Sequence, residues 1–268
     1  MLSSNLALSR RLECAEGHAC KQFAEARRQL FPECGSCWIE CAGAYAVFDG
    51  SHAPTTQTFG LGLFEQITHA SLDVIERFFL EKGAQVHHEV SPFAGVSTLE
   101  LLCSRRYQPI EISNVMFRPV AALARADCGH VRVRLSGPDE APLWAGTSSR
   151  GWTHEHPELF ASLKHFGVIC ASRQDSRCFL AEFDDQPGAA AALSIHEGVA
   201  LFAGAATVPE LRRRGLQSAL LQDRMNYALE HGCDLAMMVA EAGSDSQRNA
   251  ERQGFQVAYT RIKWQLPS

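Results

Sequence analysis

The sequence has no apolar run of the roughly 18 residues that a membrane-spanning helix needs. Its first residues, MLSSNLALSRRLECAEGH, also lack a long apolar stretch and are typical of an amphipathic helix. We therefore expect no signal peptide, no membrane partner and a cytoplasmic location. The formal net charge is −5, so the composition gives no general basic surface for nucleic acid.

The ten cysteines form only one cluster, in FPECGSCWIEC, where Cys34, Cys37 and Cys41 lie close together. A CxxC pair is half of a zinc site or a redox pair, but no second pair follows at ligand spacing. We therefore expect no metal site. Most of the cysteines are interpreted as small buried thiols in a reducing compartment.

Several motifs of nucleotide and acyl chemistry are missing. The phosphate-binding pattern GxxxxGK(S/T) does not occur, and GLGLFE (Gly60–Glu65) lacks the third glycine of the dinucleotide fingerprint. There is no G-x-S-x-G elbow, so nothing in the sequence favours an acyl-enzyme mechanism.

Hydrophobic periodicity predicts a mixed α/β protein in which strands and helices alternate. The elements expected in the second half are a strand at His130–Ser136, helices at Pro142–Trp152 and Pro157–Phe166, a strand at 177–184, a hairpin turning at Glu197-Gly198, a helix at Leu216–Glu230, a strand at Asp234–Ala240, a helix at Ser246–Gln253 and a last strand at Phe255–Gln265.

The first half repeats this order weakly. Its expected elements are a helix at Leu63–Lys82, a strand at 84–90, a helix at Ser97–Arg106 and a strand at 107–117. Glu81–Ser91 aligns with Glu230–Ala240, with Glu, Gly and Val at matching positions. We interpret the chain as two related modules joined near Arg118–His130.

Three adjacent arginines, Arg212 to Arg214, precede Gly215 and the helix that begins at Leu216. The helix dipole disfavours positive charge at this end, so a merely solvated helix face would carry acidic residues here. A helix N-terminus with free N–H groups, a glycine and nearby arginines is instead suited to an anion. We predict a site for a di- or polyphosphate.

The segment Arg212-Arg213-Arg214-Gly215-Leu216-Gln217 resembles the acyl-CoA-binding signature of the GNAT N-acetyltransferase superfamily, Q/R-x-x-G-x-G/A. The resemblance extends to the strand end ATVP before it and to ERQGF (Glu251–Phe255) after it, and covers about Arg177 to Trp264. One departure is Gln217, where the family has Gly or Ala. We expect its longer side chain to point away from the phosphates.

The resemblance implies an α/β fold of two tandem GNAT-like modules, each a mixed, mostly antiparallel sheet flanked by helices. Residues 1–125 would form a degenerate module, because Glu65 would repel a phosphate where the second module has its arginines. Residues 126–268 would form the acetyl-CoA-binding domain. The implied activity is direct transfer of acetyl from acetyl-CoA to an amine of a small molecule or peptide, by a monomer or a homodimer.

The resemblance also implies which residues hold the co-substrate acetyl-CoA. The pyrophosphate would lie on the loop and helix start, and the pantetheine arm along the preceding strand end. The implied cofactor-binding residues are Ala206, Thr207, Val208, Arg213, Arg214, Gly215, Leu216, Gln217, Ser218, Ser246 and Asn249.

The catalytic groups are harder to predict. Family members often carry a glutamate on the strand before the arginines and a tyrosine on the last helix, but here 201–207 has no carboxylate and Ala250 takes the tyrosine position. Possible bases are Glu241, Glu197 and His196, each of which also fits an ordinary surface or turn position. Tyr259 is a candidate acid, although strand tyrosines often only pack.

Two other functions fit the same residues. The chain would be a non-catalytic CoA-binding sensor or regulatory protein if the missing catalytic groups have no substitute. Alternatively, the small residues Ala203 to Ala206 would leave room for an acyl group longer than acetyl.

Overall fold

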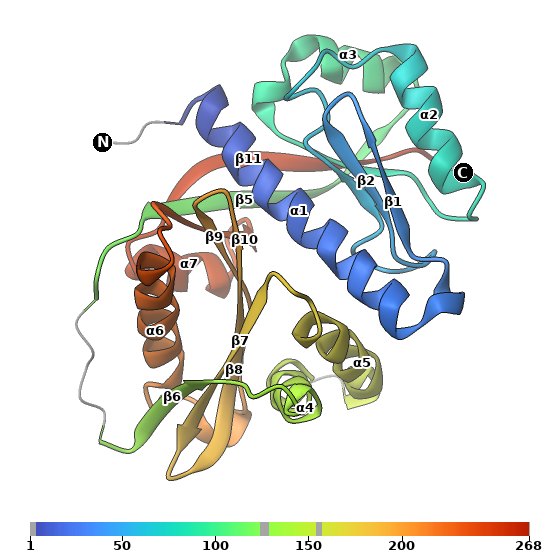
Figure 1. Ribbon diagram of the computed structural model, residues 1–268. Helices are drawn as coiled ribbons and strands as arrows, with labels where there is room; N and C mark the ends of the chain where they lie inside the picture. The colour runs from blue at the N-terminus through green and yellow to red at the C-terminus, as the bar shows by residue number, and fades with distance from the viewer. Residues whose placement is uncertain (1–3, 124–128, 154–156, 268) are drawn as a thin grey trace. The chain divides into compact units, whose positions relative to one another are not determined.

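The computed structural model describes residues 4–123, 129–153 and 157–267 (Figure 1). The chain divides into two compact units, the first formed by Met1–Arg118 and Met237–Ser268 and the second by Pro119–Ala236. The predicted module boundary at residues 125 and 126 lies outside the described residues. None of the described helices combines the length and apolar character that a membrane crossing needs.

The first unit contains a mixed sheet, with strands in the order β1-β2-β3-β4-β11-β5. Its strands are β1 (Cys37–Cys41), β2 (Ala44–Phe48), β3 (Gln57–Phe59), β4 (His87–Val90), β5 (Gln108–Pro119) and β11 (Gln256–Gln265). β3 and β4 are parallel, whereas the other neighbours pair antiparallel. The last strand of the chain therefore lies between β4 and β5 of the first unit, which the local sequence pattern did not predict.

Helices α1 (Leu6–Leu30), α2 (His69–Leu80), α3 (Val96–Ser104) and α7 (Asp245–Arg252) complete this unit, with short turns η1 (Pro32–Cys34) and η2 (Pro92–Ala94). The Asn5 side chain caps α1 by accepting the Leu8 N–H at 2.9 Å. Leu8, Leu12 and Phe23 recur at helical spacing and are buried. This apolar face packs against β1, β2 and β3.

In the first unit one element was not predicted and one prediction is wrong. The hairpin β1–β2 was not foreseen, because its cysteines were considered as ligands rather than as strand residues. The helix predicted from Leu63 begins instead at His69. Gly60 and Gly62 have positive φ and hold a turn, and Thr68 caps the true helix start by accepting the Ser71 N–H at 3.2 Å.

A buried charge cluster fixes β11 in the first unit. Arg261, 2% exposed, contacts Glu13 at 3.2 Å and Glu16 at 2.5 Å, both on α1, and Glu89 of β4 at 3.1 Å. Tyr259 adds a hydrogen bond from its hydroxyl to Glu13 at 2.9 Å. The guanidinium therefore joins three segments of the chain, and its charge is balanced by carboxylates in the low-dielectric interior.

The second unit is an antiparallel sheet in the order β9-β8-β7-β6. Its elements are β6 (Val131–Leu135), α4 (Ala141–Trp152), η3 (Pro157–Leu159), α5 (Phe160–Ala171), β7 (Ser176–Phe183), β8 (Gln186–His196), β9 (Val199–Thr207), η4 (Pro209–Leu211) and α6 (Leu216–Glu230). β10 (Leu235–Glu241) begins in this unit and ends in the first. Figure 1 shows α6 on one face of β7–β9, with α4 and α5 on the other.

The mixed α/β class predicted from the sequence is confirmed. In the second unit the hairpin turns as predicted, since Glu197 and Gly198 have φ values of 45° and 76°. The helix predicted at Leu216–Glu230 has these bounds in the structure. The helix predicted from Pro157 instead extends as α5 to Ala171.

The expectation that most cysteines are buried is wrong for the described residues. Cys178 and Cys233 are buried and Cys103 is exposed, whereas the others are partly exposed. All of the described cysteines are free thiols.

The charge cluster predicts a pH-dependent stability. Burial raises the pKa of Glu13 from 4.5 to about 7, although the Arg261 charge opposes this, with smaller contributions from Glu16, Tyr259 and Glu89. Between pH 4.5 and about pH 7 the folded protein therefore binds more protons than the unfolded chain. The contribution of Glu13 to the free energy of unfolding is fully present below pH 4.5 and is lost as the pH rises to about 7.

Glu13→Gln keeps an acceptor for Tyr259 and does not titrate. In urea unfolding, we expect the free energy of unfolding of Glu13→Gln, taken relative to wild type, to be larger at about pH 8 than at about pH 5. Glu40→Gln, at an exposed position of β1, is the control and is expected to show no such trend. If the difference in free energy of unfolding between Glu13→Gln and wild type is the same at both pH values, the prediction is contradicted.

Candidate functional site

The predicted anion site lies in the second unit, where β9 passes through η4 into α6. The Val208 N–H donates to the Gly188 carbonyl at 2.9 Å, which fixes the end of β9 against the start of β8. A side chain at Gly188 would lie 2.5 Å from Leu211 and 2.9 Å from Leu216. The loop therefore packs closely on the backbone at Gly188, and a larger residue there would displace the ends of the Leu211 and Leu216 side chains.

Two left-handed residues shape the loop before α6. Gly215 is the N-cap residue with φ 85°, and Arg213 has φ 63°, an uncommon value for a residue with a side chain. Ala219 makes the first intrahelical bond, to the Gly215 carbonyl at 3.0 Å. The N–H groups of Leu216, Gln217 and Ser218 precede that bond and have no side-chain cap, and no acidic residue occupies the first turn. The end of the helix is thus open to an anion.

The three arginines have different surroundings, although all are exposed. Arg212 turns back onto the protein, where its Nη2 donates to the Gly151 carbonyl at 3.2 Å and its Nε to the Thr207 carbonyl at 3.4 Å. Arg214 lies over the Phe183 ring at 5.4 Å. Arg212 therefore ties the loop to α4 and β9, and Arg213 and Arg214 are the charges that remain beside the helix end.

Gln217 is engaged by the strand end. The Thr207 hydroxyl donates to its Oε1 at 3.3 Å. This contact directs the Gln217 side chain toward β9. The expectation that this side chain points away from the phosphates stays a prediction. Ala206 and Val208, on either side of Thr207, are buried.

A β-bulge interrupts β9 just before these residues. Ala190 pairs with Ala206 and Ala192 with Ala203, so Gly204 and Ala205 together face the single residue Ala191. Gly204 has φ 61°, and both Ala203 and Gly204 are exposed. A bulge leaves backbone groups outside the regular ladder and re-aims them, so this stretch offers an accessible backbone next to the predicted anion site.

The remaining predicted site residues belong to the first unit. Glu241, at the end of β10, is exposed, as are Ser246 and Asn249 on α7. Asn249 accepts a hydrogen bond from Arg252 at 2.7 Å. Tyr259 is buried, and its hydroxyl donates to Glu13; burial raises the pKa of this hydroxyl well above its usual value, and the Glu13 charge acts in the same direction. The roles predicted for these residues stay predictions.

Of the other two base candidates, Glu197 is an exposed residue of the β8–β9 turn and His196, beside it, is partly exposed. Both lie at the opposite end of β9 from Thr207. The second unit thus brings together the predicted residues Ala206 to Val208 and Arg213 to Ser218, and it places these two candidates away from them.

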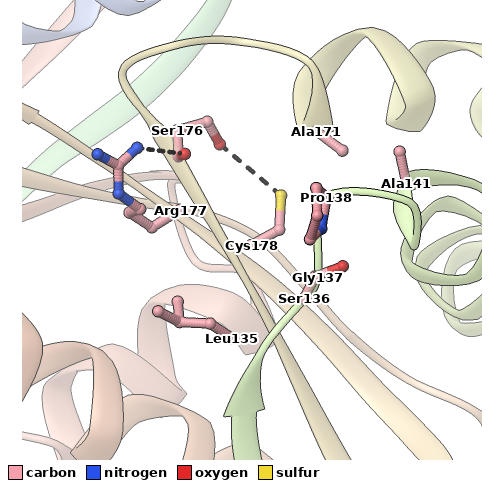
Figure 2. A pocket seen from close by; sticks show the side chains of 9 residues that line it. All are labelled: Leu135, Ser136, Gly137, Pro138, Ala141, Ala171, Ser176, Arg177 and Cys178. Atoms are coloured by element: carbon pink, nitrogen blue, oxygen red, sulfur yellow. Dashed lines mark hydrogen bonds between the residues drawn. The ribbon is translucent and has the colours of Figure 1, made fainter.

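The second unit has a separate pocket, whose lining side chains are drawn in Figure 2. Its volume is about 150 Å³. It lies where β6 joins α4, with Ser176 and Cys178 of β7 on its wall; the two side chains are 3.8 Å apart. Ala141, the first residue of α4, lines the pocket. Near the other end of the helix, the Gly151 carbonyl accepts from Arg212 in the loop before α6. The pocket and the predicted site therefore lie at opposite ends of α4, about 15 Å apart along the helix.

Residues 141–255 match the model of the acetyltransferase (GNAT) family. This segment is a GNAT acetyltransferase domain. It includes β9, the arginine loop and α6, which carry the geometry described above. No curated protein is similar enough in sequence to match the chain.

Solved structures extend the likeness to the whole chain. A GCN5-related N-acetyltransferase from Kribbella flavida has 18% identity and a TM-score of 0.65, covering 93% of this chain and 96% of the other. A tandem GNAT protein from the clavulanic acid biosynthesis pathway has 13% identity and a TM-score of 0.60, covering 100% and 98%. The predicted tandem GNAT fold is confirmed, and this fold supports acyl transfer from CoA to an acceptor.

The sequence did not predict every notable residue of the GNAT domain. Gly204 lies within a predicted strand, where a glycine often marks a bulge, but no bulge was predicted there. Arg224, inside the predicted helix, is 3% exposed. Gly151 was not singled out, because its importance depends on a contact between distant segments.

The packing of α4 on β9 generates a prediction with an internal control. A Cβ at Gly151 would lie 2.7 Å from Ala206 Cβ and 3.0 Å from the Thr207 nitrogen, whereas one at Gly146 of the same helix would meet nothing within 4 Å. We expect Gly151→Ala to lower the free energy of unfolding by about 1–3 kcal/mol through overpacking. Gly146→Ala should raise it by about 0.5–1 kcal/mol, because alanine is the better helix former.

Urea unfolding of both variants measures the difference. Equal effects of the two substitutions would show that α4 does not pack on β9 as closely as described.

Proposed function

We propose that the chain is an N-acetyltransferase that binds acetyl-CoA at the β9–α6 connection and transfers acetyl directly to an amine. The observation that carries this proposal is the uncapped N-terminus of α6, behind a left-handed Gly215 and flanked by Arg213 and Arg214, inside a GNAT domain. The pyrophosphate of CoA would accept hydrogen bonds from the N–H groups of Leu216 to Ser218.

The bulge of β9 supplies a place for the thioester. In the proposed mode the pantetheine arm follows the strand end at Ala206 to Val208, which directs the thioester toward Gly204. A backbone N–H aimed out of the ladder at the bulge would donate to the thioester oxygen. Such a donor stabilises the tetrahedral intermediate more than the substrate, because negative charge develops on that oxygen.

The transfer itself needs a neutral amine. An alkyl amine with a pKa near 10.4 loses its proton at neutral pH at a cost of roughly 4.5 kcal/mol. The nitrogen lone pair then attacks the thioester carbon, the C–S bond breaks, and the thiolate of CoA takes up a proton, giving an amide and free CoA. Glu241 is retained as the proposed base and Tyr259 as the proposed acid; the contact of Tyr259 with Glu13 makes the acid the weaker assignment.

One observation favours a second function. β9 carries no carboxylate and Ala250 on α7 is a buried alanine, so two groups expected from the family resemblance are missing. A CoA-binding sensor would need the anion site alone. Release of free CoA thiol from acetyl-CoA in the presence of a panel of small amines and peptides distinguishes the enzyme from the sensor.

Calorimetric titration of acetyl-CoA tests the anion site directly. We expect Arg213→Ala/Arg214→Ala to weaken acetyl-CoA binding at least tenfold, because charge-assisted contacts to the pyrophosphate are lost. Acetyl-pantetheine lacks the pyrophosphate and should bind weakly to wild type and variant alike.

The matched control is Arg28→Ala/Arg77→Ala, which removes the same charge from exposed positions of α1 and α2. It should bind acetyl-CoA as wild type does. If wild type does not bind acetyl-CoA, or if both double variants weaken binding equally, the proposed site is wrong.

A further inference from the structure

A second arginine of α6, distant from the loop, is buried in the second unit. Arg224 is 3% exposed. Its Nε donates to the Leu220 carbonyl at 3.2 Å and its Nη1 to the Ala192 carbonyl at 3.1 Å, and its guanidinium lies 4.7 Å from the Phe202 ring. The side chain thus reaches from the helix to the strands β8 and β9.

No carboxylate of the described residues forms an ion pair with Arg224, in contrast to Arg261 with its three glutamates. Burial alone lowers the pKa of Arg224, to about 9, so the guanidinium still carries its charge near neutral pH. An unneutralised buried charge is unfavourable for folding, because only neutral carbonyls and an aromatic face replace its water. Such a group calls for a reason other than stability.

The charge lies at the bulge of β9. Ala192, whose carbonyl accepts from Arg224, pairs with Ala203, the residue just before Gly204. Phe202, under the guanidinium, precedes Ala203. On the opposite face of the sheet Trp144 of α4 donates its Nε1–H to the carbonyls of Ala191 and Phe179, at 3.3 and 3.1 Å.

Side chains from both faces therefore anchor β8 at the two residues next to the bulge. A Cβ on Gly204 would lie 3.9 Å from the Trp144 ring, so the indole lies beside the bulge glycine, which stays exposed. The strand residues next to the bulge are thus contacted by an aromatic ring from one face and by a cation from the other.

We propose that Arg224 is a positioning residue, whose buried guanidinium holds the β9 bulge and favours negative charge on the thioester oxygen bound there. The inference rests on the proposed function, which puts that oxygen at Gly204. A positive charge in a low-dielectric interior acts over several ångströms, so Arg224 need not touch the substrate.

The test compares Arg224→Met with Arg224→Lys. Methionine fills much of the same apolar space without charge, whereas lysine keeps the charge. We expect Arg224→Met to unfold at a urea concentration equal to or above that of wild type, since an unpaired buried charge is removed. A purely structural arginine would instead be needed for folding, and its loss would lower the urea concentration at which half of the protein is unfolded.

The functional readout uses two ligands, CoA and S-carboxymethyl-CoA, which carries a carboxylate next to the sulfur. We expect wild type to prefer S-carboxymethyl-CoA over CoA. In Arg224→Met, the ratio of the Kd for CoA to the Kd for S-carboxymethyl-CoA should fall about tenfold, while the Kd for CoA itself stays within about twofold of wild type. Arg224→Lys should keep most of the wild-type ratio. With an amine acceptor, the same Met variant should lower kcat about tenfold with an unchanged KM for acetyl-CoA.

Arg132→Met is the control, because it removes one charge from an exposed position of β6 in the same unit. It should leave both Kd values unchanged. If Arg224→Met does not fold, Arg224→Gln takes its place under the same criteria.

The outcomes separate the two proposals. If wild type binds CoA and Arg224→Met keeps the full preference for the carboxylate ligand, this inference is overturned and the proposed function stands. If wild type binds neither ligand, the proposed function is wrong and this inference falls with it. If Arg224→Met and Arg224→Lys lose the preference for S-carboxymethyl-CoA equally, this inference is also overturned, because the charge of Arg224 would then not be the property that matters.

Discussion

The first unit depends on one buried guanidinium. Arg261 of β11 contacts Glu13 and Glu16 of α1 and Glu89 of β4, so a single side chain joins the end of the chain to its beginning and to a strand between them. Truncating either side of such a pair leaves an uncompensated charge in the interior, which is strongly destabilising. The position of β11 between β4 and β5 is therefore specified by charge as well as by backbone pairing.

The second unit uses the same residue type for a different purpose. Arg212 satisfies carbonyls of Gly151 and Thr207 and so acts as a structural tie. Arg213 and Arg214 remain at a helix end where positive charge opposes the dipole. Arg224 is buried without a carboxylate among the described residues. These charges, placed against local stability, lie around β9 and α6, within residues 141–255 that the GNAT family model matches.

Local patterns predicted the parts of this protein that depend on neighbours in sequence. Periodicity gave the bounds of α6, and Glu197-Gly198 gave the β8–β9 turn. The arginines and Gly215 predicted an anion site, because the N-terminus of a helix is the positive end of its dipole, and the structure places them at a helix start without a side-chain cap. The pairing of β11 with β4 and the bulge opposite Ala191 depend on register between distant segments, and no local pattern encodes them. For the same reason, the contacts of Arg224 with β8 and β9 do not follow from the helix pattern.

The place of β11 also bears on how the protein is made. During synthesis β4 and β5 leave the ribosome long before Gln256–Gln265, so the strand that separates them is still missing. All residues of the second unit, Pro119–Ala236, are synthesised before β11, and during that time β4 and β5 lack the strand that lies between them. Unpaired strand edges are sites of aggregation, so a chain released before β11 is made would carry two such edges in its N-terminal half.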